Sequence, residues 1–154
     1  MSLSIRRSGR DEAETHFALQ RKASLAGLAH IYPPDEFPYP DDAIRERWQG
    51  IAGVVLLAEH AGVAVGVAAV DGCWLHGLYV VPDAWGTDVA RALHDAALAE
   101  LADCAEVKLW VLEENRRARR FYEKSGWRPN GTTRVVEYPP HPLDVGYSFI
   151  REEP

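Results

Sequence analysis

Residues 115–127 read NRRARRFYEKSGW, and this stretch decides how the rest of the chain is interpreted. Asn115 predicts the start of a helix, because an asparagine N-cap accepts a hydrogen bond from a first-turn backbone N–H group. Gly126 predicts the end of the helix, since glycine readily adopts the positive φ found after many helices. Between these ends, Asn115, Ala118 and Tyr122 fall on one helical face. The stretch therefore predicts a capped helix whose one face carries a small residue and a phenol.

A run of arginines in the same helix admits three interpretations: a nucleic-acid patch, a site for an anionic group, or a solvated helix face. The run consists of Arg116, Arg117, Arg119 and Arg120. The whole chain has 17 basic and 23 acidic residues and a net charge of -6. This balance opposes a general nucleic-acid binder, which usually presents a strongly basic face. We therefore expect no nucleic-acid partner, and the other two interpretations stay open.

The length of 154 residues fits one compact domain, and we expect a single domain over residues 1–154. A content of 47% hydrophobic and 26% charged residues is ordinary for a globular protein and argues against disorder or a coiled coil. No apolar run approaches the ~18 residues of a membrane-spanning helix, so we expect no membrane partner. The first ten residues also lack the apolar run of a signal peptide.

The two cysteines, Cys73 and Cys104, lie far apart in the sequence and form no metal-ligand spacing. Nothing in the sequence suggests a disulfide framework, so a reducing cytoplasm is the expected location. The six histidines form no HxH, HExxH or Cys/His pattern either, and we therefore expect no metal.

Hydrophobic periodicity predicts the element order β-α-α-β-β-β-α-β-α-β-β. The expected strands are 3–7, 53–59, 63–70, 74–81, 107–112, 133–138 and 144–150, and the expected helices are 11–32, 43–48, 88–102 and 115–125. The strand–helix–strand unit over 74–112 should be a right-handed crossover that places two strands parallel. This order implies an α/β fold, in the sense of an α+β mixed sheet of about seven strands flanked by about four helices.

Two of the expected helices have an apolar stripe that should face the core. In the first helix the stripe consists of Phe17, Ala18, Leu25 and Leu28, and Leu19 falls outside it. In the helix at 88–102 it consists of Val89, Leu93, Ala97 and Leu101.

The motif Asn115-x-x-Ala118-x-x-Phe121-Tyr122-Glu123-Lys124-x-Gly126-Trp127 resembles the NxxAxxFYEKxGF segment of the GNAT superfamily of N-acetyltransferases, with Trp127 replacing the usual phenylalanine. The element order is similar to that fold across nearly the whole chain. The resemblance implies a GNAT-like acyl-CoA N-acyltransferase fold with acetyl-CoA as the cofactor. In the family, the tyrosine hydroxyl protonates the departing thiolate, and the asparagine and alanine border the pantetheine arm. It implies that Tyr122 is the general acid and that Asn115 and Ala118 contact the cofactor.

The phosphate-binding loop of that family has the pattern Q/R-x-x-G-x-G/A, and its best match here lies within LYVVPDAWGTDVARAL, residues 78–93. Trp85 takes the Q/R position, Asp88 the first glycine position and Ala90 the last, so two of three positions depart from the pattern. A helix N-terminus at this place favours a pyrophosphate. The alternative is that Thr87 or Asp88 only caps the helix. The cofactor contacts implied by the resemblance are Leu78, Val80, Val81, Trp85, Gly86, Thr87, Asp88, Val89, Ala90, Arg91 and Arg119.

The acceptor side departs from the family as well. Some relatives place a glutamate four or two residues before the position of Leu78, where this chain has Trp74 and His76. An imidazole titrates near neutrality, so His76 is the expected general base, with a structural strand histidine as the alternative. The expected substrate-binding residues are Tyr32, Glu36, Phe37, Tyr39, Trp74 and Tyr147. Aromatic and acidic side chains suit a cationic amine, although the loop containing Tyr32 to Tyr39 is equally read as an ordinary surface loop.

The expected function is N-acetyl transfer from acetyl-CoA to a primary amine of a small molecule or peptide, by direct attack, with Tyr122 as general acid. The alternative is a catalytically silent GNAT-fold protein that binds or senses a small molecule. The resemblance is also consistent with a homodimer.

Overall fold

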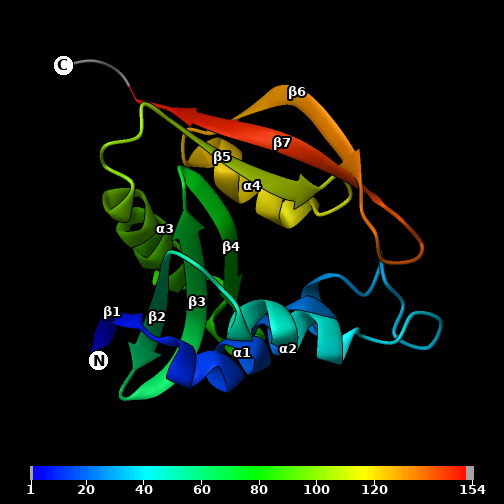
Figure 1. Ribbon diagram of the computed structural model, residues 1–154, viewed down its shortest axis with the longest axis horizontal. Helices are drawn as coiled ribbons and strands as arrows, with labels where there is room; N and C mark the ends of the chain where they lie inside the picture. The colour runs from blue at the N-terminus through cyan, green and yellow to red at the C-terminus, as the bar shows by residue number, and fades with distance from the viewer. Residues whose placement is uncertain (1, 152–154) are drawn as a thin grey trace.

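The computed structural model describes residues 2–151, and within them seven strands and four helices follow the expected order (Figure 1). The strands are β1 (Leu3–Ser8), β2 (Val54–His60), β3 (Val63–Asp71), β4 (Trp74–Val80), β5 (Glu106–Leu112), β6 (Arg128–Val135) and β7 (Leu143–Ile150). The helices are α1 (Ala13–Gly27), α2 (Asp41–Gln49), α3 (Val89–Glu100) and α4 (Arg116–Lys124). The predicted fold class is confirmed. None of the helices within residues 2–151 is long and apolar enough to cross a membrane.

The strands form one sheet in the order β1-β2-β3-β4-β5-β7-β6. Only β4 and β5 are parallel, as the crossover through α3 requires. Their pairing is limited to Trp74 and Lys108, at the beginning of both strands. Because no further pairing holds them, β4 and β5 separate toward their C-terminal ends (Figure 1). This separation opens the sheet in its middle.

Helices cover both faces of the sheet around this opening. The apolar stripe of α3 packs on one face, where Val89, Leu93, Ala97 and Leu101 are all buried, as predicted. Helices α1 and α2 pack on the other face through a second buried cluster that includes Phe17. The two cores hold β3 and β4 between them and so fix one wall of the opening.

The predicted stripe of α1 was partly wrong. Ala18 is exposed, Leu19 is buried, and the helix ends at Gly27 rather than at residue 32. The buried face also contains two polar side chains, His16 and Gln20. His16 bonds to Ser8 through Nε2 (2.7 Å), and Gln20 accepts a hydrogen bond from Trp48 Nε1 (2.7 Å). A buried face that contains polar side chains cannot be recognised from the spacing of apolar residues alone.

The expectation of unpaired cysteines was wrong as well. Cys73 and Cys104 form a disulfide across a sequence separation of 31 residues. Cys73 lies in the turn before β4 and Cys104 in the loop before β5. The crossover brings the starts of these parallel strands together, and Lys108 N–H donates to the Cys73 carbonyl (3.1 Å) beside the disulfide. Distance along the chain therefore gave no measure of distance in the fold.

Candidate active site

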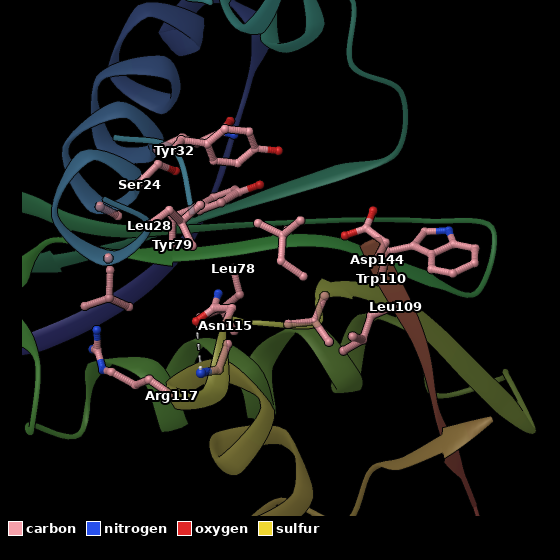
Figure 2. Close-up of a pocket in the computed structure, with 18 of the residues that line it drawn as sticks. Ser24, Leu28, Tyr32, Leu78, Tyr79, Leu109, Trp110, Asn115, Arg117 and Asp144 are labelled. Atoms are coloured by element: carbon pink, nitrogen blue, oxygen red, sulfur yellow. Dashed lines mark hydrogen bonds between the residues drawn. The ribbon is translucent and has the colours of Figure 1, made fainter. Parts of the chain in front are cut away.

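A cleft of about 1550 Å³ lies where β4 and β5 separate. Its walls come from α1, the loop that follows and α2, from β4 and β5, from the loop before α3 and the start of α3, from α4, and from the segment joining β6 to β7. Figure 2 shows some of these side chains. A site for one small ligand usually measures ~300–1,000 Å³. The larger volume is sufficient for two ligands that meet near the separation of the strands.

The start of α4 borders this cleft in the predicted way. The Asn115 side chain accepts a hydrogen bond from the Ala118 N–H group (3.4 Å), so the N-cap is confirmed (Figure 2). Asn115, Ala118 and Tyr122 all line the cleft, as their helical spacing predicts. The local sequence thus turns one face of α4 toward the opening.

Tyr122 is held in this face by aromatic packing. Its ring meets Phe121 and Trp127 edge to face, with centroid distances of 5.4 and 5.8 Å. Only 8% of the residue is exposed. Burial raises the pKa of Tyr122 above its ordinary value, with a further contribution from Tyr79. The phenol therefore keeps its proton at neutral pH, which is the state that a general acid requires.

Trp85, at the departing Q/R position, has two contacts. Its Nε1 donates to the Val80 carbonyl (2.7 Å), and the Arg117 guanidinium lies 3.4 Å from the centre of its ring. Partial burial lowers the pKa of Arg117 below its ordinary value, although an arginine stays charged at neutral pH. Trp85 therefore carries no charge itself but holds a cation at the cleft.

Thr87, in the loop before α3, caps the N-terminus of that helix. Thr87 Oγ1 accepts a hydrogen bond from Val89 N–H (3.4 Å), whereas the Asp88 side chain makes no cap bond. Asp88 is exposed and does not line the cleft, whereas Gly86, Thr87, Ala90 and Arg91 do. The carboxylate of Asp88 is thus kept away from the cleft wall.

The arginine run divides between cleft and surface. Arg117 and Arg120 line the cleft, and Arg116 lies 3.6 Å from Glu114 in an exposed ion pair. Arg119 turns away from the cleft: it donates to the Tyr147 hydroxyl (2.9 Å) and to the Glu113 carbonyl (3.0 Å). The expectation that Arg119 contacts the cofactor is therefore corrected, since it is Arg117 and Arg120 of this run that line the cleft.

Three other expected contacts lie outside the cleft. Val81 and Val89 are buried in the cores on opposite faces of the sheet, which leaves only their backbone groups available. Tyr147 is fully buried and donates a hydrogen bond to Glu123 of α4. Side chains alternate along a strand, so Tyr147 and Asp144 lie on opposite faces of β7, and it is Asp144 that lines the cleft. The expected role of Tyr147 in the acceptor pocket is corrected.

The remaining predicted residues line the cleft. Those on the cofactor side include Leu78 and Val80, and those on the acceptor side are Tyr32, Glu36, Phe37, Tyr39, Trp74 and His76. The β3–β4 register passes from Leu75 to Gly77, which makes His76 the extra residue of a β-bulge. Its exposed ring stacks on Trp74 with a centroid distance of 6.3 Å. Its role as a base stays a prediction.

Several cleft residues escaped sequence reasoning, namely Tyr79, Trp110, Arg117, Arg134, Tyr138 and Asp144. Asp144 had a detectable signal, because it is the one carboxylate within the otherwise uncharged strand segment DVGYSFI. Arg134 and Trp110 had none, since their proximity to Asp144 depends on strand pairing.

A buried histidine, His94, packs against Phe121 and Trp127, the two rings that contact Tyr122. His94 Nε2 accepts a hydrogen bond from Trp127 Nε1 (2.9 Å), so Nδ1 carries the proton and donates to Asp95 (2.9 Å). Burial lowers the pKa of His94 below its ordinary value, against a smaller opposing effect of Asp95. Burial likewise lowers the pKa of His16. Both side chains are therefore stabilised in the neutral form.

We expect the free energy of unfolding to fall as the pH drops from 7.5 to 5.5. Below about pH 6.5 the histidines of the unfolded chain bind protons that the folded chain does not accept. Carboxylates titrate at lower pH and contribute little in this range. The slope of the unfolding free energy against pH reports the difference in bound protons between the unfolded and folded chains. His94→Gln, which keeps an acceptor for Trp127, should reduce this difference by up to one proton. Urea unfolding at several pH values measures it, and an unchanged slope would contradict the assignment to His94.

Comparisons with known proteins place this geometry in a family. Residues 4–127 match the model of the acetyltransferase (GNAT) family. The chain therefore belongs to the GNAT family of acetyltransferases.

Among sequence relatives, the chain is 39% identical over 105 residues to uncharacterized N-acetyltransferases of Mycobacterium tuberculosis (strain ATCC 25618 / H37Rv) and Mycobacterium bovis (strain ATCC BAA-935 / AF2122/97). The match covers 64% of this chain and 66% of each relative, just under two thirds of their length.

Solved structures show the same fold at low identity. Apo-form YjaB from Escherichia coli has a TM-score of 0.78 and 23% identity, covering 99% of this chain and 100% of that one. The PaiA N-acetyltransferase from Thermoplasma acidophilum in complex with coenzyme A has a TM-score of 0.75 and 19% identity, covering 98% and 100%. YncA from Salmonella typhimurium with its cofactor acetyl-CoA has a TM-score of 0.68 and 17% identity, covering 100% and 96%.

Proposed function

We propose that the protein transfers the acetyl group of acetyl-CoA to a primary amine of a small molecule or peptide. The observation that carries this proposal is a cleft, at the separation of β4 and β5, with cations at one end and a buried phenol beside it. Membership of the GNAT family and the coenzyme A and acetyl-CoA complexes of two fold neighbours support it.

The α3–α4 end of the cleft holds four cations, Arg91, Arg117, Arg120 and Lys124, whereas Arg47 of α2 and Arg134 of β6 line other parts of it. Within residues 2–151, the carboxylates that line the cleft come from elsewhere, namely the loop after α1, the segment after β6, and β7. A chain with a net charge of -6 does not produce such an arrangement through composition alone. These residues fit a ligand with several phosphates.

Bound acetyl-CoA would supply an acetyl group activated as a thioester. The chain's own groups are arranged along β4 and α4 to act on it. Val81 N–H donates to the Val65 carbonyl of β3 (3.0 Å), and successive strand residues direct their backbone groups to opposite sides. The backbone groups of Val80 therefore face the separation, where its N–H is positioned to stabilise negative charge on an oxygen.

Proton transfer falls to two side chains on opposite elements. Tyr122 would give its phenolic proton to the departing sulfur. His76, on the bulge of β4, would receive the proton that the attacking amine loses. Asn115 and Ala118 would lie along the cofactor between these groups and the cations.

A catalytically silent binding protein is the second candidate. It is favoured by the departures at Trp85 and Asp88 and by the use of the Val80 carbonyl for a bond to Trp85 (2.7 Å). A protein of this kind would use the same cleft without transferring an acetyl group.

Calorimetric titration with acetyl-CoA, coenzyme A and 3′-dephospho-coenzyme A tests the cofactor assignment. We expect micromolar binding of the first two and weaker binding of the third. Arg117→Gln should weaken acetyl-CoA roughly 10-fold, because it removes a charge-assisted contact worth about 1.5 kcal/mol or more. The matched control, Arg116→Gln, should bind like the wild type. Absence of acetyl-CoA binding in the wild-type protein would overturn the proposal.

Three further statements about the protein stay predictions. They are a single domain over residues 1–154, a cytoplasmic location, where acetyl-CoA is available, and a homodimer. The disulfide bears on the second, because such bonds are rare in a reducing cytoplasm.

A further inference from the structure

Asp144 is a buried carboxylate at the acceptor end of the cleft. Its side chain is 9% exposed, and it lies on β7 directly opposite Arg134 of β6. Figure 2 shows its carboxylate and the indole of Trp110 on one side of the cleft, with Tyr32 and Tyr79 on the facing side. The other carboxylates that line the described cleft, Glu36 and Glu137, are exposed. Water weakens the charge of an exposed carboxylate, so Asp144 is the strongest anionic group here.

Among the described residues, only one of the two oxygens of the Asp144 carboxylate accepts a hydrogen bond. Arg134 Nε donates to Oδ2 (2.9 Å), and within residues 2–151 no hydrogen bond reaches Oδ1. Oδ1 is open to the cleft that Asp144 lines, so a ligand there can donate a hydrogen bond to a carboxylate whose other oxygen is already held. The missing partner must be a hydrogen-bond donor, and a cation is favoured over a neutral group.

Aromatic side chains line the same cleft as this carboxylate. Trp74 and Trp110 stack with a centroid distance of 6.1 Å and an interplanar angle of 23°. Burial raises the pKa of Tyr32 to about 12, and the negative charge of Asp144 adds to the shift, as expected for a phenol near the carboxylate. The same charge contributes to the raised pKa of the half-buried Tyr79. Aromatic faces attract cations, and phenol oxygens accept hydrogen bonds from them.

Arg134 already packs against one of these aromatic rings. The Arg134 guanidinium lies 4.6 Å from the centre of a Trp110 ring, with a side chain that is 55% exposed. It offsets part of the Asp144 charge but leaves Oδ1 without a partner. Solvent also screens the charge of Arg134 more than that of Asp144, whose side chain is 9% exposed.

We propose that Asp144 binds the ammonium group of the acceptor, and that the acceptor is a primary amine carried on a flat, aromatic group that lies against Trp74 and Trp110. This inference rests on the proposed acetyl transfer and names the acceptor class for it. A primary ammonium group has three donors. Asp144 Oδ1 accepts one, and a phenol oxygen of Tyr32 or Tyr79 accepts the second. The third is the proton that passes to His76, so that the neutral amine attacks.

Titration of the coenzyme A-loaded protein with 2-phenylethylamine measures this contact without turnover. 2-Phenylethanol, of similar shape but without charge, is the comparison ligand. We expect the wild-type protein to bind the amine at least ~10-fold more tightly than the alcohol, because only the cation completes the carboxylate. Asp144→Asn should remove this preference, and Glu137→Gln, which neutralises an exposed carboxylate on the same side of the cleft, should retain it.

The outcomes distinguish a failure of the proposed function from a failure of this inference alone. If the wild-type protein does not bind coenzyme A, the proposed function is overturned and this inference with it. If coenzyme A binds but the amine and the alcohol bind equally, the inference alone is overturned, and this outcome needs no variant. Equal amine affinity in Asp144→Asn and wild type, with normal coenzyme A binding by both, would also overturn it.

Discussion

Tyr122→Phe is expected to lower the turnover of acetyl transfer ~10²–10⁴-fold, the range for loss of a general acid, while the affinity for acetyl-CoA stays unchanged. The substitution removes only the hydroxyl and keeps the ring between Phe121 and Trp127. Within residues 2–151 that hydroxyl makes no hydrogen bond, so its loss should cost little stability. Release of free thiol in the presence of an accepted amine measures turnover, and calorimetry measures affinity.

A second phenol in the same cleft provides the control. Tyr138 lines the cleft from the segment after β6, and Tyr138→Phe should leave turnover close to that of the wild type. The pH profile is a further check. Burial raises the pKa of Tyr122 above the ordinary 10.0, so turnover should not fall through its deprotonation at or below pH 10. Wild-type turnover in Tyr122→Phe would show that the departing sulfur takes its proton from elsewhere.

The features that sequence reasoning predicted well are local ones. A cap asparagine, a helical spacing and a terminating glycine lie within thirteen residues, so the face of α4 that borders the cleft was readable from NRRARRFYEKSGW alone. The stripe of α3 was readable for the same reason, because Val89, Leu93, Ala97 and Leu101 repeat at helical spacing, although the buried His94 beside them was not predicted. The alternation of strands and helices then led to the parallel pair β4 and β5, whose separation forms the cleft.

The features that it missed depend on pairing between distant segments. Arg134 meets Asp144 because β6 and β7 are in register there, and the irregularity between Pro129 and Thr133 shifts that register. The expected strand at 133–138 in fact begins at Arg128 and ends at Val135, since Val136 N–H already bonds across the turn to Pro142. No local pattern contains this information.

The arginine run shows the same limit within a single helix. Helical spacing groups Arg116 with Arg119 and Arg120, yet the ring of Trp85 selects Arg117 for the cleft, and the hydroxyl of Tyr147 draws Arg119 away. Both selecting groups come from other elements. The family pattern treats Trp85 as a lost contact, whereas the structure shows it as the support for a new cation.

Removal of the Cys73–Cys104 disulfide is expected to lower the free energy of unfolding by about 3–4 kcal/mol. The bond closes a loop spanning 31 residues that contains β4 and α3, and opening the loop increases the entropy of the unfolded chain. For a chain of this length, the loss corresponds to a decrease in Tm of roughly 10 °C. Urea unfolding of the double variant C73S/C104S, compared with the oxidised wild type, measures it.

Dithiothreitol separates the bond itself from the effect of the substitutions. It should destabilise the wild-type protein by a similar amount and leave C73S/C104S unchanged. The disulfide also lies beside the pairing of Trp74 with Lys108, where β4 and β5 are held together before they separate. Loss of the bond should therefore loosen the closed end of the cleft. It should weaken binding of 2-phenylethylamine, for which we propose contact with Trp74, more than binding of acetyl-CoA, for which we propose a place near α3 and α4. Equal stability of the oxidised wild type and C73S/C104S would show that the two thiols do not constrain the unfolded chain.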